Sequence, residues 1–335
     1  MKKSAKALLA FICIIALVAW AVLYALFGFI PSKYFTESDK NVAAIEVEDE
    51  LNNLDIMANT WETALPQTEI YRLITDHFNS PLPEGKTEKK AIVIGYDGCR
   101  ADTFRLIDPK KSSGIYTLLN EGGQAVFSYA GGVNYPAENT QATSTAPGWC
   151  SMLTGVLADV HKITDNGIVK EIEPKTLLLS LVEDKTVDSS AFYVSWDGHF
   201  SKKDATYIKE KEYAEENKFP VNFKRALFDT GTKKNVLNDI KSSDCSDFIF
   251  LTLEYTDHNG HNSGFSLQNP NSVNGFRKAD DAGAQFINAI KARENYDKED
   301  WLILITTDHG GYGGGHGGPT IDERITFIVS NKTII

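Results

Sequence analysis

Short apolar runs recur along the chain from residue 91 onward, and segments with helical character separate them. The apolar runs are Ala91–Tyr96, Ala191–Trp196, Phe248–Tyr255, Trp301–Thr307 and Thr326–Ser330. Near-continuous apolar runs of this length predict strands that are buried on both faces. The predicted helices between them are Ile115–Asn120, Pro174–Glu183, Phe223–Ile240 and Lys278–Arg293. This alternation predicts an α/β fold in which helices cover both faces of a mainly parallel sheet.

The N-terminal pattern differs, because residues 8–30 carry no charge and follow three lysines within the first six residues. A run of this length spans the apolar core of a bilayer as one helix. The basic flank predicts a cytoplasmic N-terminus and an extracytoplasmic remainder. A cleaved signal peptide is the alternative, since Ala19-Trp20-Ala21 has the form of a cleavage site. We favour a single-pass cell-membrane anchor, because the apolar run continues well past that tripeptide.

Composition changes again after the apolar run. Residues 31–90 are polar and acidic, with one helix-compatible stretch and a Pro/Gly-containing segment, and we expect a stalk or linker there. Residues 1–30 would form a cytoplasmic tail and transmembrane helix, and residues 91–335 one folded domain. Of the four cysteines, Cys13 lies in the apolar run, and the spacing of the other three selects no disulfide.

Charge limits the classes of partner. The 335 residues carry a formal net charge of −11, and lysine and arginine are concentrated nowhere in the chain. Binding to nucleic acid depends on clusters of such cations, so we expect none. A small phosphorylated substrate would also need local positive charge, which metal ions are able to supply.

Acidic and histidine residues follow three of the predicted strands, at the sheet edge where open α/β folds bind ligands. The residues after the first, third and fourth strands are Asp97, then Asp257 and His261, then Asp308, His309 and His316. Taken singly, an aspartate there is compatible with a helix cap, a histidine with a solvated loop, and the glycine-rich segment with a flexible hairpin. Gathered at one edge, however, the carboxylates would repel each other without a cation. The set therefore predicts bound metal.

The type of ligand indicates the type of ion. Mixed Asp and His ligands favour Zn²⁺, with Mn²⁺ as an alternative, because Ca²⁺ and Mg²⁺ sites are built from oxygen atoms. The spacing Asp257-x-x-x-His261 allows two side chains from one turn of chain to reach the same ion. The glycines around His316 remove side chains that would crowd it.

The hydroxyl of Thr145 lies at the N-terminus of a predicted helix, a position where a phosphate would bind. Pro147 predicts the first turn of a helix that begins just after Thr145. The N–H groups and the dipole at a helix N-terminus attract phosphate. On this motif alone Thr145 reads as an ordinary N-cap, but a metal-coordinated Thr alkoxide is also a competent nucleophile.

Taken together, these motifs resemble the alkaline phosphatase superfamily, and within it the type I phosphodiesterase/nucleotide pyrophosphatase enzymes. The motifs that carry the resemblance are Asp97-Gly98-x-Arg100, Thr145-x-Pro147 with Ser151-x-Leu153-Thr154-Gly155, Asp257-x-x-Gly260-His261-x-x-Gly264, and Asp308-His309-Gly310. The segment 160–166 is similar to the stretch that follows the nucleophile helix in that family. In order and spacing, the resemblance runs from residue 91 to about residue 330, which implies an alkaline-phosphatase-like catalytic domain at 91–335.

The resemblance implies a site with two divalent metal ions. One ion would be held by Asp97, Thr145, Asp308 and His309, and the other by Asp257, His261 and His316. Thr145 would act as the nucleophile and form a covalent phospho-threonine, which water would then hydrolyse.

Three positions depart from the family pattern or qualify it. The spacing from Asp308 to His316 looks like that of enzymes that transfer ethanolamine phosphate, because in phosphodiesterases the third histidine comes much later. Gly148 stands where related phosphodiesterases often carry an Asn that binds a phosphate oxygen. Thr145 is not the Cys of sulfatases, which makes sulfate-ester hydrolysis improbable.

The resemblance implies a metal-dependent phosphoric-ester hydrolase of the phosphodiesterase/pyrophosphatase type, and the predicted N-terminal anchor implies that its substrate is extracytoplasmic. We expect a phosphate-ester small molecule, or a lipid or glycan head group. A phosphomonoesterase, a membrane-associated phosphoethanolamine- or phosphoglycerol-type transferase, and a metal-stabilised binding module stay open as alternatives. We prefer hydrolysis, because water is always available and no acceptor-binding motif is recognisable. The choice between mono- and diester would depend on loops such as 162–175 and 198–222.

Overall fold

The computed structural model describes residue 51 and residues 54–132, 140–167 and 172–335. Its strands are β1 (Leu65–Pro66), β2 (Glu88–Tyr96), β3 (Gln124–Tyr129), β4 (Ser190–Val194), β5 (Val221–Arg225), β6 (Phe248–Leu253), β7 (Glu299–Thr306) and β8 (Ile325–Ser330). Its α-helices are α3 (Glu69–Asn79), α4 (Gly114–Asn120), α5 (Thr145–Thr154), α6 (Ala158–His161), α7 (Leu177–Glu183), α8 (Ile208–Glu216), α9 (Asp229–Ile240), α10 (Tyr255–Ser263), α11 (Pro270–Lys291) and α12 (Ile321–Arg324). Two 3₁₀ helices are η2 (Trp61–Thr63) and η3 (Ala101–Leu106).

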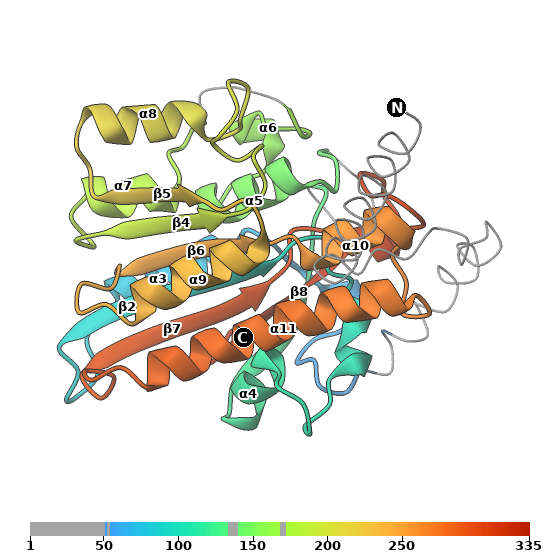
Figure 1. The fold of residues 1–335 in the computed structure, drawn as a ribbon, viewed down its shortest axis with the longest axis horizontal. Helices are drawn as coiled ribbons and strands as arrows, with labels where there is room; N and C mark the ends of the chain where they lie inside the picture. Colours follow the sequence, from blue (N-terminus) through green and yellow to red (C-terminus); the bar gives the residue numbers. More distant parts are fainter. Residues whose placement is uncertain (1–50, 52–53, 133–139, 168–171) are drawn as a thin grey trace, which may run out of the picture.

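One eight-stranded sheet organises the molecule, in the order β1-β3-β8-β7-β2-β6-β4-β5 (Figure 1). Strands β7, β2, β6 and β4 run parallel, as do β4 with β5 and β1 with β3. Strand β8 pairs antiparallel with both β3 and β7. The predicted α/β class with a mainly parallel sheet is confirmed, and the carboxyl ends of β7, β2 and β6 are adjacent.

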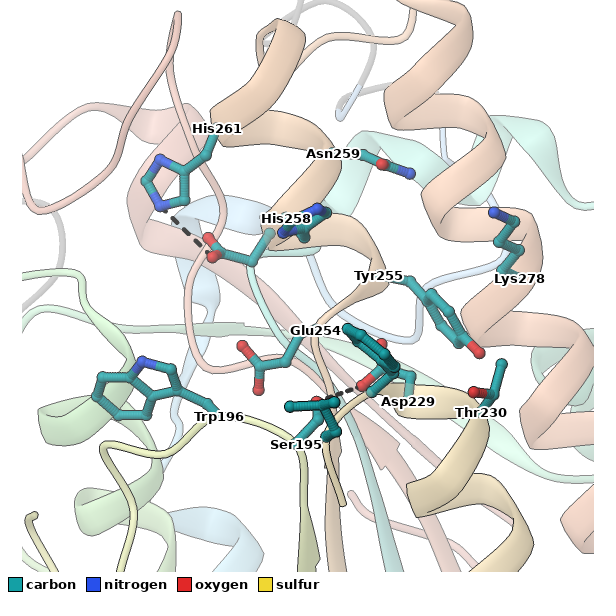
Figure 2. A pocket seen from close by; sticks show the side chains of 13 residues that line it. Ser195, Trp196, Asp229, Thr230, Glu254, Tyr255, His258, Asn259, His261 and Lys278 are labelled. Carbon is teal, nitrogen blue, oxygen red and sulfur yellow. Dashed lines mark hydrogen bonds and ion pairs between the residues drawn. The ribbon is translucent and has the colours of Figure 1, made fainter. Parts of the chain in front are cut away.

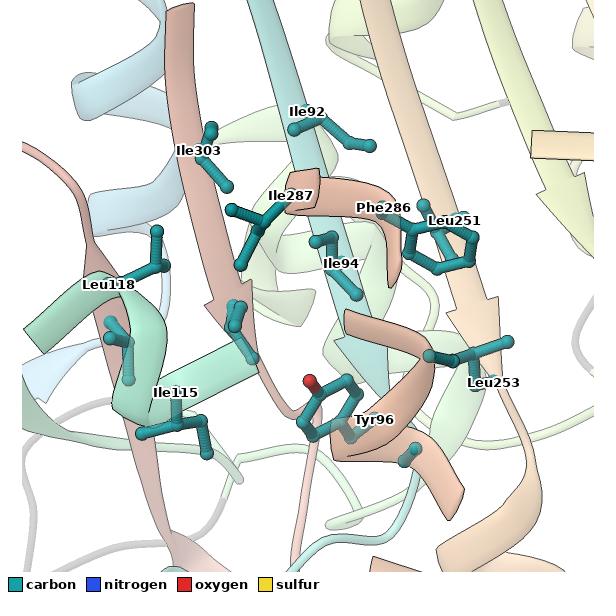
Figure 3. Close-up of a cluster of buried hydrophobic side chains, with 14 of the residues drawn as sticks. Ile92, Ile94, Tyr96, Ile115, Leu118, Leu251, Leu253, Phe286, Ile287 and Ile303 are labelled. Carbon is teal, nitrogen blue, oxygen red and sulfur yellow. The ribbon is translucent and has the colours of Figure 1, made fainter. Parts of the chain in front are cut away.

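Helices bury both faces of this sheet. Successive side chains of a strand point to opposite faces, so Ile92 and Ile94 of β2 enter one core and Ala91 and Val93 the other. The first core packs against α4, α9 and α11 (Figure 3). The second packs against α3, α5 and α7. Both cores exclude water from the strands that lead to the candidate ligands.

All five predicted strands are present, with ends that shift by a few residues. The predicted helix Phe223–Ile240 is wrong in its first part, because residues 221–225 form the edge strand β5, and the helix begins at Asp229. Asp257 and His261, expected to lie on one turn of chain, lie on one turn of helix α10. Strand β3 was not predicted.

The segment expected to be a stalk also contributes to the fold. Strand β1 pairs with β3, and the amphipathic helix α3 buries Ile70, Leu73 and Ile74 in the second core. Its sequence was recognised as helix-compatible, but only the packed structure shows the apolar face against the sheet. In the described part of the chain, no helix combines the length and apolar character of a membrane span. The expected span at residues 8–30 lies outside that part.

Candidate metal centre

Three parallel strands bring the predicted ligands together. Asp97 directly follows β2, and Asp308 lies two residues after β7. Asp257 and His261 lie four residues apart on α10, which follows β6, so both side chains project from the same face of that helix. Because β7, β2 and β6 are neighbours, the carboxylates meet above their carboxyl ends.

Asp97, Asp308 and His309 form the first cluster. His309 Nε2 lies 3.3 Å from Asp308 Oδ2 and 3.6 Å from Asp97 Oδ1. All three side chains are fully buried. Each offers a ligand atom within 4.8 Å of the others, as a shared ion requires.

Neighbouring groups orient these ligands. The indole Nε1–H of Trp149 donates to Asp97 Oδ2 at 3.0 Å, and the main-chain N–H of Gly98 donates to Asp308 Oδ1 at 3.1 Å. His309 Nδ1 lies 2.6 Å from the carbonyl oxygen of Gly310, which assigns the proton to Nδ1 and leaves Nε2 with a free lone pair. Trp149 is therefore a positioning residue as well as part of the core, a role its sequence context did not indicate.

Asp257, His261 and His316 form the second cluster. His261 Nε2 lies 3.4 Å from Asp257 Oδ2, and His316 Nε2 lies 3.5 Å from Asp257 Oδ1. His316 also stacks on His309, with ring centroids 3.9 Å apart. The two clusters therefore adjoin, and the glycine-rich segment that carries His316 folds back onto the sheet edge.

The unprotonated Nε2 atoms of His261 and His316, the two histidines of the second cluster, face each other. Nδ1 of His261 lies 3.2 Å from the Gly314 carbonyl oxygen, and Nδ1 of His316 lies 2.9 Å from that of Thr143. Each Nδ1–H donates to a carbonyl, so both Nε2 atoms carry lone pairs, yet they are only 3.1 Å apart. A cation bound beside them would remove this repulsion, with both Nε2 atoms as its ligands.

Buried polar atoms that lack a hydrogen bond indicate whether the two clusters are suited to metal ions. Among the described residues, the buried side-chain atoms without a hydrogen-bond partner include Asp97 Oδ1, Asp257 Oδ1, Asp308 Oδ2 and His309 Nε2. Such atoms are costly unless an ion satisfies them. Burial and neighbouring aspartates raise the pKa of Asp97 and Asp308 well above the usual range, and burial raises the pKa of Asp257 to about 7. A divalent cation would reverse these shifts, so the donor set fits metal.

Thr145 is the first residue of α5 and is almost fully buried. The chain before it contacts the second cluster through the Thr143 carbonyl that accepts from His316. The chain after it contacts the first, because a Cβ added at Gly148 would lie 2.8 Å from Asp308 Cβ. Segment 143–148 thus passes between the two clusters. The absence of a side chain at Gly148 is explained by this close approach to Asp308.

A hydrogen-bonded cluster supports α5 from behind. Ser151 Oγ lies 3.0 Å from His161 Nε2 and 3.1 Å from Gln141 Nε2. His161 Nδ1 accepts from the Ile163 N–H, so its Nε2–H donates to Ser151. Burial lowers the pKa of His161 to about 4, which keeps the ring neutral. These contacts fix the helix that begins at Thr145.

Sequence reasoning missed Glu254, which lies at the end of β6. Its carboxylate comes within 4.8 Å of ligand atoms of Asp97 and Asp257. Burial and these neighbouring charges raise its pKa well above the usual range. The one available signal was its place three residues before Asp257.

A cavity of about 390 Å³ adjoins the second cluster (Figure 2). Asp257 and His261 line one side of it, and Trp196, Glu254 and Tyr255 are among the other residues that line it. Its volume falls in the range of small-molecule sites. The centre therefore opens into a space large enough for an organic group attached to a phosphate.

A family model described as "Type I phosphodiesterase / nucleotide pyrophosphatase" matches residues 91–313. The chain belongs to this family. The predicted membership is confirmed, and the family comprises metal-dependent phosphoric-ester hydrolases of the alkaline phosphatase superfamily. No curated protein matches the chain.

Several solved structures are similar to this member of the family. An inactive variant of murine ectonucleotide pyrophosphatase/phosphodiesterase 5, in complex with AMP, is 17% identical over 67% of this chain, with a TM-score of 0.45. The periplasmic domain of a Campylobacter jejuni phosphoethanolamine transferase is 13% identical over 74% of this chain and 80% of its own, with a TM-score of 0.47. Alkaline phosphatase of the Antarctic bacterium TAB5 is 13% identical over 73% of this chain and 91% of its own, with a TM-score of 0.45. The alignment spans 57% of the murine chain.

Proposed function

We propose that this protein hydrolyses phosphodiester or pyrophosphate bonds, with Thr145 as the nucleophile. The observation that supports this most is the convergence of two Asp/His clusters on the N-terminus of α5. Two divalent cations, which we propose to be Zn²⁺, would be held by Asp97, Asp308, His309 and Thr145, and by Asp257, His261 and His316. When bound, they would lower the pKa of the hydroxyl nucleophile and offset negative charge on the phosphoryl oxygens and the leaving oxygen.

The reaction divides into two transfers. Thr145 Oγ forms a bond to phosphorus, the bond to the ester oxygen breaks, and the alcohol leaves with a proton. Water then attacks phosphorus of the phospho-threonine, the bond to Thr145 breaks, and the hydroxyl regains its proton. The net result is one alcohol and one phosphomonoester for each diester hydrolysed.

The first turn of α5 offers little main chain for phosphate binding. The Ala146 N–H already donates to Asn166 Oδ1 at 2.8 Å, and Pro147 has no N–H. We infer that the Thr145 N–H is the donor left for a phosphate oxygen, and the Asn166 amide is bonded to the residue next to it. We propose that Asn166 makes the contact that Gly148 lacks.

The direct test is hydrolysis of nitrophenyl mono- and diesters by the full chain, after chelation and again with Zn²⁺ or Mn²⁺ restored. Thr145→Ala should lower kcat by about 10³-fold or more and, because Asp97, Asp308 and His309 remain as ligands, leave the metal content close to its wild-type value when metal is in excess. Thr145→Ser is the matched control, since it keeps the hydroxyl, and it should retain measurable turnover. Normal turnover in the Thr145→Ala protein would exclude the assignment.

Phosphoethanolamine- or phosphoglycerol-type transfer is the second candidate, favoured by the Asp308–His316 spacing. In that reaction a lipid or glycan hydroxyl would replace water in the second transfer. A protein that binds metal and forms phospho-threonine, but releases the phosphoryl group only when such an acceptor is added, would support transfer over hydrolysis.

We also propose a location outside the cytoplasm, with residues 8–30 as a single membrane anchor. The uncharged run and the three lysines before it support this orientation. Protease added to intact cells should then degrade the domain. Protection of the domain until the cells are lysed would contradict the proposal.

A further inference from the structure

We propose that Thr143 is a positioning residue of the metal centre, which holds His316 at the second cluster and ties that cluster to the segment of Thr145. This inference rests on the two-metal site of the proposed function and adds a residue to it. It follows from three hydrogen bonds that join Thr143 to residues 316–318.

Thr143 contacts three successive residues of the glycine-rich segment. Its carbonyl oxygen accepts from the Nδ1–H of His316 at 2.9 Å. Its hydroxyl oxygen accepts from the Gly317 N–H at 3.0 Å, and the hydroxyl donates to the Gly318 carbonyl oxygen at 2.8 Å. Because Thr143 is fully buried, water does not compete for these bonds.

Two main-chain N–H groups fix the chain on either side of Thr143. The Ala142 N–H donates to the Thr164 carbonyl oxygen at 2.9 Å, and the Ala146 N–H donates to Asn166 Oδ1 at 2.8 Å. Neither bond involves the glycine-rich segment. Thr143 therefore offers a fixed position against which that segment is placed.

The glycine-rich segment needs such a support, because its glycines have no side chains to pack. A Cβ added at Gly314 or Gly315 would meet no atom of the described residues within 4 Å. Glycine also permits the φ of +111° at residue 317, from which the N–H reaches the Thr143 hydroxyl. Next to His316, hydrogen bonds to Thr143 therefore supply the positioning that side-chain packing supplies in the core.

Two further hydrogen bonds hold the ends of the segment. The Phe265 N–H donates to the Gly313 carbonyl oxygen at 2.7 Å, and the Gly318 N–H donates to Glu323 Oε1 at 2.8 Å. Both bonds set the path of the chain, but neither involves the histidine ring. The ring is bonded through its Nδ1–H to Thr143.

This bond determines which nitrogen of His316 is able to bind an ion. With Nδ1–H donated to Thr143, Nε2 is unprotonated and lies 3.5 Å from Asp257 Oδ1. Outer partners of this kind orient metal ligands, and their loss typically lowers metal affinity by roughly 10- to 100-fold. Thr143 also lies two residues before Thr145, so one short segment carries both the support of His316 and the proposed nucleophile.

The test is an equilibrium titration of the chelated full chain with Zn²⁺, measured through competition with a chromophoric chelator. The wild-type chain should bind two ions. Thr143→Val keeps the shape of the side chain and removes the hydroxyl, so it should weaken one ion by roughly tenfold or more and leave the other unchanged. Thr143→Ser restores the hydroxyl and should recover most of the lost affinity.

A second ligand variant assigns the weakened ion. His316→Ala removes the ligand itself, so it should weaken the same ion, and Thr143→Val added to it should cause little further loss. Thr326→Val is the matched control, because this buried hydroxyl bonds to Ser128 Oγ at 2.7 Å and belongs to neither cluster. It should lower the free energy of unfolding and leave both Zn²⁺ affinities at their wild-type values.

The outcomes separate this inference from the proposed function. Unchanged affinities in Thr143→Val, weakening of both ions, or additive losses in the double variant would overturn the inference and leave the hydrolase assignment intact. If Thr143→Val does not fold, Gly317→Ala disturbs the same bond from the other side and should weaken the same ion. Selective loss of one ion, in a protein whose wild type hydrolyses no ester, would support the inference and count against the proposed function. A wild-type chain that binds fewer than two ions would overturn both.

Discussion

Two buried polar clusters flank helix α5, and they differ in how their atoms are satisfied. Behind the helix, Ser151, His161 and Gln141 bond to one another and to main chain. At its N-terminus, Asp97 Oδ1 and Asp308 Oδ2 are equally buried but have no hydrogen-bond partner in the described part of the chain. The two clusters are buried to the same extent, but only the first has its hydrogen bonds satisfied. We therefore infer that the first cluster stabilises the fold and that the second binds cations.

We expect the largest effect from neutralising one of the unpartnered carboxylates, because this change removes the difference between the two clusters. Asp308→Asn removes a charged ligand, so metal affinity should fall by at least about 100-fold, and turnover with it. In the metal-free protein the same change removes charge repulsion with Asp97, so the free energy of unfolding should rise. Metal titration and denaturant unfolding after chelation check the two effects. A metal-free variant less stable than the metal-free wild type would contradict the account.

A methyl group at Gly148 should disturb both the fold and the first cluster. The added Cβ would lie 2.8 Å from Asp308 Cβ and 2.9 Å from its carbonyl oxygen, and neither atom is free to move. Gly148→Ala should lower the free energy of unfolding by about 1–3 kcal/mol and weaken metal binding. Gly315→Ala is the control, because its Cβ would meet no atom of the described residues within 4 Å. Equal effects of the two substitutions would exclude the close approach as the cause.

The satisfied cluster should behave differently. Ser151→Ala leaves His161 Nε2–H and the Gln141 amide without their shared partner, so the free energy of unfolding should fall by about 1–3 kcal/mol. Metal content should stay at the wild-type value, because no ligand is touched. Thr154→Val is the control, since that hydroxyl bonds chiefly to the Cys150 carbonyl of its own helix. Metal loss in Ser151→Ala would show that the clusters are not independent.

The smallest expected effect is a pH dependence from His161. Burial lowers its pKa from 6.5 to about 4. Below pH 6.5 the His161 ring is therefore protonated in the unfolded chain, whereas in the folded chain it stays neutral down to about pH 4. The free energy of unfolding should fall as pH drops through this window, by up to about 1.4 kcal/mol per pH unit from this group. His161→Gln should have a shallower slope in denaturant unfolding, and an unchanged slope would argue against a neutral His161.

Sequence patterns predicted the parts of the fold that depend on local order. The buried strands appear as apolar runs because both faces of a covered parallel sheet exclude water. Strand β5 was mistaken for helix because it lies at the sheet edge, where its half-exposed residues give no apolar run. Helix α3 was placed in a stalk, since an amphipathic segment shows its partner only after packing.

For the site, the sequence alone determined the kinds of ligand atom and their position after the strands, because the carboxyl ends of parallel strands share one edge. Only the tertiary structure decided which of them meet, that His316 stacks on His309, and that Glu254 faces an aromatic cavity. Those contacts join segments far apart in the chain. They depend on strand order and loop path, which no local pattern of residues encodes.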